Sequence, residues 1–190
     1  MKWVSHQIIT TSAVLVVTGS PALAVMAGAM SPLPDKIDHI CGVFGRMPIR
    51  MFNHREHSHY WGYWAVIAIF AYAYMKKNGV FLTDTYSYLS LGKLLVSSGD
   101  TAWVKNFLLP NMVFWGAIGS LFHIFEDFFS GMGVPLVFPN KISPHISLYK
   151  TGGISEYLLT AAVSFVLIAF YMSESPALYA VQNIWVKCFQ

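Results

Sequence analysis

The chain has 190 residues, of which 55% are hydrophobic and only 11% are charged. Soluble domains carry about 25% charged residues, so there is too little charge here to cover a water-facing surface, and we expect lipid to cover part of it. The formal net charge of +3 includes no basic run, so nucleic acid is not an expected partner. The two cysteines, Cys41 and Cys188, lie far apart and require neither a disulfide nor a zinc ribbon.

Two short apolar segments come first, at residues 5–18 and 21–30. Ser20 suits an N-cap and Pro21 suits the first helical turn, so the second helix is predicted to begin there. Prolines soon after residue 30 stop it. Each segment is too short to cross a membrane alone, so the pair predicts either a shallow helical hairpin or one long kinked span.

The same region imitates a secretory signal peptide. Lys2, the apolar stretch 8–17 and Ala-Leu-Ala at 22–24 have the order of a charged region, a hydrophobic region and a cleavage site. We expect the segment to be retained, because His6 belongs to the candidate site described below.

Three longer helices are predicted at 60–75, 110–129 and 155–172. Twenty helical residues rise about 30 Å, the thickness of the hydrocarbon core. The segment 110–129 fits this length, and the other two can span with aromatic ends at the interface. The stretch 84–107 mixes charged and apolar residues and is predicted to be an interfacial element.

Polar residues gather at one end of this plan. If the first two helices form a hairpin and the next three run up, down and up, one end holds the following residues: His6, Asp35, Asp38, His39, His54, His57, His59, His123, Glu126, Asp127, His145 and Glu156. Placing ionisable groups beside membrane helices costs free energy unless they are paired, bind a metal or contact water. Imidazoles and carboxylates at one level suit a divalent metal such as zinc. The alternative is that polar loops simply lie outside the membrane.

Loops do not readily explain His123 and Asp127, which lie inside an apolar helix. They are four residues apart and share one helix face, so both can reach one ion. The alternative is a buried hydrogen bond between them. Glu126 lies near that face, where we expect it to be solvated, and Glu156 suits the dipole at its helix start.

Two further segments leave alternatives open. Residues 54–59, His-Arg-Glu-His-Ser-His, could bring alternating imidazoles to a metal. Alternatively, Arg55 could bind an anionic group with its planar guanidinium. The third alternative is a solvent-exposed polar loop with neither role. In residues 33–39, Asp35 and Asp38 would ligate one ion or two, or form a polar turn after the prolines.

Together these motifs resemble the YdjM-like family of membrane-bound metal-dependent hydrolases. The matching residues, in order, are His6, Leu33-Pro34-Asp35 with Asp38-His39, His54-Arg55 with Ser58-His59, His123 and Asp127, Gly133-Val134-Pro135-Leu136-Val137-Phe138-Pro139, and Gly152 with Glu156. Three features depart from the family pattern. One residue too many separates Asp35 from Asp38, Glu56 replaces a glycine, and Ser58 replaces a threonine. We prefer Asp35 as the ligand, because it directly follows Leu-Pro. The motif helix is also similar to zinc-dependent phospholipase C, which suggests more than one zinc ion and phosphoester hydrolysis.

The predicted fold is all-α, a small polytopic membrane helical bundle with a metal site at one end. Residues 1–175 form the membrane-embedded domain and 176–190 a C-terminal tail. The expected metal ligands are His6, Asp35, His59, His123 and Asp127, and the expected catalytic residues are His54, Arg55 and Glu156. His54 and Glu156 would complete the shell or position water, and Arg55 would hold a phosphate.

The resemblance implies a metal-dependent hydrolase that acts on a lipid or phosphoester through metal-activated water, with zinc as the expected cofactor. We expect it in the inner membrane of a bacterium, with the site end facing the cytoplasm because that end carries slightly more Lys and Arg. One alternative is a membrane di-iron hydroxylase or desaturase, since His54-x-x-His57-x-His59 imitates a histidine box. Another is a non-catalytic membrane binding protein whose helices are stapled by the metal.

Overall fold

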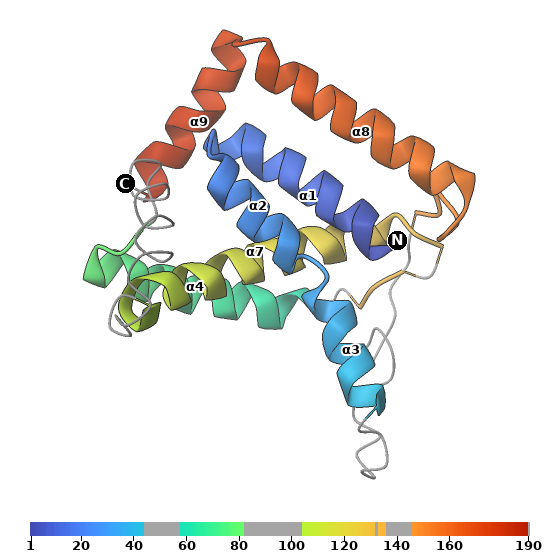
Figure 1. Ribbon diagram of the computed structural model, residues 1–190, viewed down its shortest axis with the longest axis horizontal. Coiled ribbons are helices and arrows are strands. Elements are labelled where there is room, and N and C mark those ends of the chain that lie inside the picture. The colour runs from blue at the N-terminus through green and yellow to red at the C-terminus, as the bar shows by residue number, and fades with distance from the viewer. Residues whose placement is uncertain (44–57, 82–103, 132, 136–145, 190) are drawn as a thin grey trace.

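The computed structural model describes residues 1–43, 58–81, 104–131, 133–135 and 146–189 (Figure 1). This part of the chain is helical and has no named strand, which confirms the all-α class. The helices are α1 (Trp3–Thr18), α2 (Pro21–Met30), α3 (Leu33–Val43), α4 (Trp61–Asn78), α7 (Leu109–Phe128), α8 (Ile154–Met172) and α9 (Pro176–Phe189), and a π-helical turn at Val104–Leu108 leads into α7. The predicted interfacial element at 84–107 falls largely outside the described residues.

Helices α1 and α2 form the shallow hairpin that was one of the two predicted alternatives (Figure 1). Gly19 ends α1 in the left-handed conformation, at φ +70°, where a residue without Cβ is favoured. Ser20 caps α2 by accepting a hydrogen bond from the Leu23 amide at 3.4 Å, and Pro21 occupies the first turn. The hairpin returns the chain to the end where α1 begins.

Helix α3 was not predicted. The prolines do end α2 at Met30, but after a two-residue turn the chain becomes helical again at Leu33. Pro34 lies in the first turn of α3, where a missing amide hydrogen leaves no helical bond unmade. Asp35 also lies in this turn, where the helix dipole favours a carboxylate. The two aspartates therefore project from a helix and not from a polar turn.

Helix α7 lies at the centre of the bundle, packed against α2 and α4. It approaches α2 at Gly119, where an added Cβ would lie only 2.3 Å from the backbone oxygen of Ala27. Around this contact the apolar core combines small side chains, several of them alanines, with the large aromatic rings of Trp64, Phe114 and Trp115. The close packing fixes the position of the α7 residues that belong to the candidate site.

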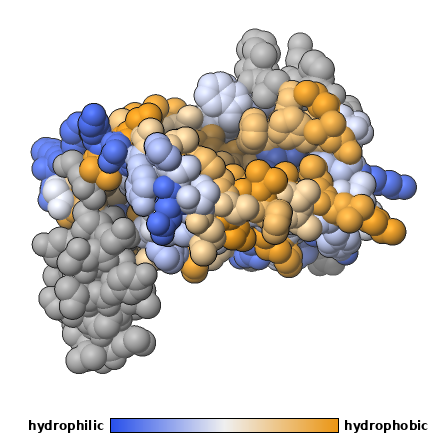
Figure 2. All heavy atoms as spheres, turned by 90° about the horizontal axis from the view of Figure 1, so that it is seen from above, coloured by the Kyte–Doolittle hydropathy of each residue, from blue (hydrophilic) through white to orange (hydrophobic). Residues whose placement is uncertain are grey.

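Among the described residues, two helices have the length and apolar character of membrane spans, Lys105–Phe128 and Ile154–Met172. Helix α8 presents large apolar side chains outwards, since Leu158, Phe165 and Val166 are 64–72% exposed. Hydrophobic residues cover a large part of the face shown in Figure 2. Helix α4, the other predicted span, has 18 residues but ends in Lys76, Lys77 and Asn78, and it is not among the candidate spans.

The C-terminal segment contains helix α9, which the sequence did not predict. It packs against α1, and Gln182 donates to the Val16 carbonyl at 3.4 Å. Trp185 contacts the Trp115 ring at a centroid distance of 5.2 Å. In Figure 1 this helix lies at the opposite side of the bundle from the N terminus, the last turns of α7 and the start of α8. It therefore belongs to the end remote from the candidate site.

Candidate metal centre

Four side chains from three parts of the chain meet at the site end. Asp35 comes from α3, His59 directly precedes α4, and His123 and Asp127 lie one turn apart on α7. One ligand atom from each lies within 4.8 Å of the others. Four of the five predicted metal ligands are thus brought together, and we call this group the four-ligand cluster.

Five of the six separations within the cluster are nearly uniform, and the sixth, between the two aspartates, is no more than 4.8 Å. The Nε2 atom of His59 lies 3.3 Å from Asp35 Oδ1, 3.3 Å from His123 Nε2 and 3.6 Å from Asp127 Oδ2. The Nε2 atom of His123 lies 3.5 Å from Asp35 Oδ1 and 3.7 Å from Asp127 Oδ2. Every ligand atom therefore has two or more others at a similar distance.

These five separations resemble the edges of a coordination tetrahedron. Zinc binds imidazole nitrogen and carboxylate oxygen at about 2.0–2.2 Å, so the ligand atoms of a tetrahedral site lie about 3.3–3.6 Å apart. Direct N–H···O hydrogen bonds are shorter, at about 2.7–3.2 Å. The four histidine–aspartate separations, at 3.3–3.7 Å, exceed that range. The geometry therefore favours a shared ion over a set of histidine–aspartate hydrogen bonds.

The burial and the charge of the cluster residues favour the binding of a cation. His59, His123 and Asp127 have fully buried side chains, whereas the Asp35 side chain is 13% exposed. Burial by itself would raise the pKa of Asp35, but interactions with His123 and His59 outweigh it and hold that pKa below its ordinary value. Burial also lowers the pKa of His59 below its ordinary value, although Asp35 opposes the change. An ionised carboxylate beside a neutral imidazole is the combination that a divalent metal requires.

The orientation of His59 is set by groups behind it. Its Nδ1 atom lies 2.9 Å from Ser58 Oγ and 3.6 Å from Asp38 Oδ2. The carbonyl of Ser58 accepts a 2.7 Å hydrogen bond from the Trp64 indole. With Nδ1 held by the Ser58 hydroxyl, Nε2 points into the cluster, and the Asp38 carboxylate adds negative charge behind the ring. The structure thus places Asp35 in the cluster and Asp38 behind His59.

His6, the fifth predicted ligand, borders the cluster without joining it. Its ring stacks on His123 at a centroid distance of 3.7 Å, and its Nε2 atom lies 3.6 Å from Asp127 Oδ1. Its Nδ1 atom lies 2.6 Å from the Glu126 carboxylate, which also accepts from Thr10 at 3.2 Å. Glu126 is only 6% exposed, so the expectation that it is solvated is wrong. Thr10 could not be predicted as a partner of Glu126, because a hydroxyl in an apolar helix has several possible hydrogen-bond partners.

Other groups hold the ends of the helices together around the cluster. The α-amino group of Met1 donates to Asp127 Oδ1 at 2.8 Å. Glu156 is fully buried and accepts three hydrogen bonds of 2.7 Å, from the Lys2 amide, the Ser5 hydroxyl and the Gly152 amide. Glu156 lies outside the four-ligand cluster, and these contacts fix the start of α1 against the start of α8.

The remaining predicted residues divide into two groups. His39 lies on α3 and is exposed to solvent. His54 and Arg55, for which catalytic roles were predicted, lie outside the described residues, as do His57 and His145.

The fold and the site define an all-α membrane protein in which histidines and aspartates from separate helices form a candidate metal centre. The model of the YdjM inner membrane protein family matches residues 1–187, so the chain belongs to that family. The family's description gives a membrane location and no activity. No curated protein and no solved structure matches the chain.

Proposed function

We propose that this protein is a membrane-bound hydrolase that depends on a divalent metal, expected to be zinc, and acts on a phosphoester of a lipid. The observation that carries the proposal is the meeting of two buried imidazoles with the carboxylates of Asp127 and the partly exposed Asp35, whose ligand atoms all lie within 4.8 Å of one another. The donors are nitrogen and oxygen only, whereas structural zinc sites are commonly built from cysteine sulfur. A zinc ion held there would supply an activated water and offset negative charge on the attacked phosphorus.

The protein's own residues would admit the substrate, bind its phosphate and hold the metal ligands in place. The exposed edge of Asp35 offers the approach for a phosphoester, because the other three ligands are fully buried. Asp38 and Ser58 would hold the His59 ring in place. Arg55, three residues before the described segment that begins at Ser58, would bind the phosphate through its planar guanidinium, and His54 would position water.

A second candidate is a non-catalytic site that staples the helices. Four protein ligands are sufficient to complete a tetrahedral shell without a coordinated water, which is the arrangement of a structural zinc site. The di-iron hydroxylase or desaturase is the remaining alternative. Identifying the bound metal distinguishes it from the other two functions, because a di-iron enzyme requires iron and consumes oxygen.

The test is hydrolysis by the purified, metal-loaded protein in mixed micelles. Phosphatidate, phosphatidylglycerol and phosphatidylcholine are each supplied, and the water-soluble phosphorus product is measured with and without a chelator. We expect product that a chelator abolishes and zinc restores. Asp35→Asn should lose this activity, and His39→Ala, on the exposed face of the same helix, should keep it. Stoichiometric metal with no product from any of the three lipids would favour the staple.

A further inference from the structure

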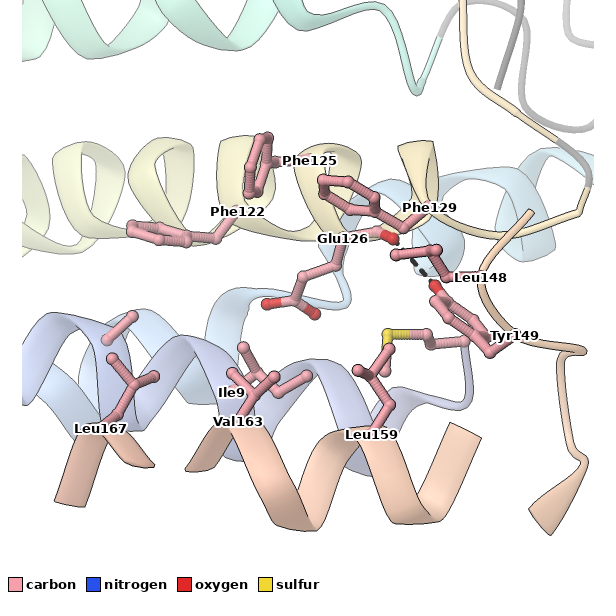
Figure 3. A pocket seen from close by; sticks show the side chains of 12 residues that line it. Ile9, Phe122, Phe125, Glu126, Phe129, Leu148, Tyr149, Leu159, Val163 and Leu167 are labelled. Atoms are coloured by element: carbon pink, nitrogen blue, oxygen red, sulfur yellow. Dashed lines mark hydrogen bonds between the residues drawn. The ribbon is translucent and has the colours of Figure 1, made fainter. Parts of the chain in front are cut away.

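A second feature lies beside the metal centre, between α1, α7 and α8. It is a cavity of about 340 Å³ whose lining is almost entirely aliphatic and aromatic (Figure 3). Small-molecule sites in proteins have volumes of about 300–1,000 Å³, so the space is large enough for a ligand. Its two polar lining side chains are already engaged. Glu126 binds His6 and Thr10, and the Tyr149 hydroxyl donates to the Glu126 carbonyl at 2.8 Å.

The cavity is elongated along the helices. On α8 it is lined by Leu159, Val163 and Leu167, one residue from each successive turn (Figure 3). Eight residues of helix rise about 12 Å, so this wall is an apolar strip about 12 Å long. Phe122 on α7 and Phe129, which directly follows that helix, line the facing wall over a similar length. An unbranched hydrocarbon chain fits such a strip better than a compact ligand does.

The cavity opens toward the apolar surface of the protein. Two of its lining residues, Phe125 and Leu148, are 61% and 59% exposed, so they mark its mouth. Both long walls belong to the two helices that are candidate membrane spans. A chain entering here would leave the hydrocarbon of the bilayer without passing through water.

The inner wall of the cavity lies close to the candidate metal centre. Glu126 lines the cavity and contacts His6, and the His6 ring stacks on His123 of the four-ligand cluster. Two side chains in series, Glu126 and His6, therefore lie between the apolar space and His123. A lipid with its chain in the cavity would lie beside the cluster.

We propose that this cavity is an acyl pocket, which holds one linear acyl chain of the glycerophospholipid whose phosphoester is hydrolysed. The proposal rests on the proposed function for the identity of the lipid. Its own support is the apolar lining, the elongated shape, the opening beside Phe125 and Leu148 on the apolar surface, and the contact of Glu126 and His6 with the metal centre.

Two valines of α8 provide a matched pair of variants. Val163 lines the pocket, and Val166, three residues later, is 64% exposed. Val163→Phe fills the pocket, whereas Val166→Phe adds the same group to the outer surface. Each methylene excluded from an apolar site weakens binding about fourfold, so loss of two or more should weaken acyl binding roughly tenfold or more. Ala13→Leu fills the pocket from α1 and guards against a defect peculiar to Val163→Phe.

The experiment is photolabelling of the detergent-purified protein with a diazirine derivative of hexadecanoic acid, followed by peptide mapping. We expect labels on pocket residues of α7 and α8, displaced by unlabelled lysophosphatidate, and reduced roughly tenfold or more in Val163→Phe and Ala13→Leu but not in Val166→Phe. Bound metal should be unchanged in all three variants. Equal labelling of Val163→Phe and wild type, or labels spread over the whole lipid-facing surface, would overturn the acyl pocket. The labelling needs no catalysis, so a failure of the hydrolase proposal leaves this result readable.

Discussion

Removing either α7 ligand should abolish most metal binding while leaving the protein inserted in the membrane. His123→Ala and Asp127→Ala each take one ligand from the cluster of four. Structural zinc sites bind with about 10–16 kcal/mol, so an even share for each of four ligands is about 2.5–4 kcal/mol. At about 1.4 kcal/mol for each factor of ten, the affinity should fall on the order of 10²–10³-fold.

The assay is competition for zinc between the purified protein and a chromophoric chelator. Circular dichroism and membrane extraction check that each variant folds and inserts. Asp127→Asn, which preserves the side-chain volume, separates loss of a ligand from loss of packing. His39→Ala is the matched control, because His39 is exposed on the helix that carries Asp35. His145→Ala, at a position outside the described residues, should also bind normally.

Wild-type affinity in both His123→Ala and Asp127→Ala would refute the reasoning. The two side chains would then be a buried structural pair. A loss in His39→Ala as large as in these variants would also contradict the assignment, because it would show that zinc binds nonspecifically to histidines at this end.

Three further outcomes follow from the structure. Asp38→Asn should weaken zinc binding about 10–100-fold, less than loss of a ligand, because Asp38 acts through His59. Gly119→Ala should destabilise the protein by about 1–3 kcal/mol and lower its Tm in detergent, because the new Cβ would meet the Ala27 backbone oxygen at 2.3 Å. A reporter fused after Lys150 should be active in the cytoplasm, because basic residues are slightly more numerous at the site end.

Each of these has its own control. Gly116→Ala should lower the Tm less than Gly119→Ala, because its Cβ would meet only the flexible end of Met30, at 2.9 Å. A Tm loss as large in Gly116→Ala would contradict the proposed helix contact. A fusion after Lys77 should report the opposite compartment from one after Lys150, and a fusion after Lys150 that reports the external side would reverse the predicted orientation. An unchanged zinc affinity in Asp38→Asn would remove Asp38 from the site.

The helices that could be predicted from the sequence are those with an apolar run and a clear boundary. Ser20 and Pro21 located the start of α2 correctly, because capping is a local property. Helix α3 was not predicted, because two prolines were interpreted as the end of the helical region. A proline in the first turn of a helix costs no backbone hydrogen bond, so a new helix could begin there. Helix α9 was missed because its packing against α1 and Trp115 is not encoded locally.

The candidate site, like the fold, could be predicted from the sequence only in part. The four-residue spacing of His123 and Asp127 predicted a shared face on one helix. That Asp35 would join them, with Asp38 behind His59, depended on α3 and on a register that the sequence left open. Glu126 shows the limit most clearly. A glutamate near a helix end is usually solvated, and only the position of His6 and Thr10 on α1 explains its burial.

The most direct test of the metal centre is zinc-edge X-ray absorption on wild-type protein purified in detergent without chelator. The account predicts one or more zinc ions for each chain, with nitrogen and oxygen ligands at about 2.0–2.2 Å that include two imidazoles. Folded protein that carries no metal after zinc loading, or zinc bound through sulfur at about 2.3 Å, would contradict the assignment of Asp35, His59, His123 and Asp127 as its ligands.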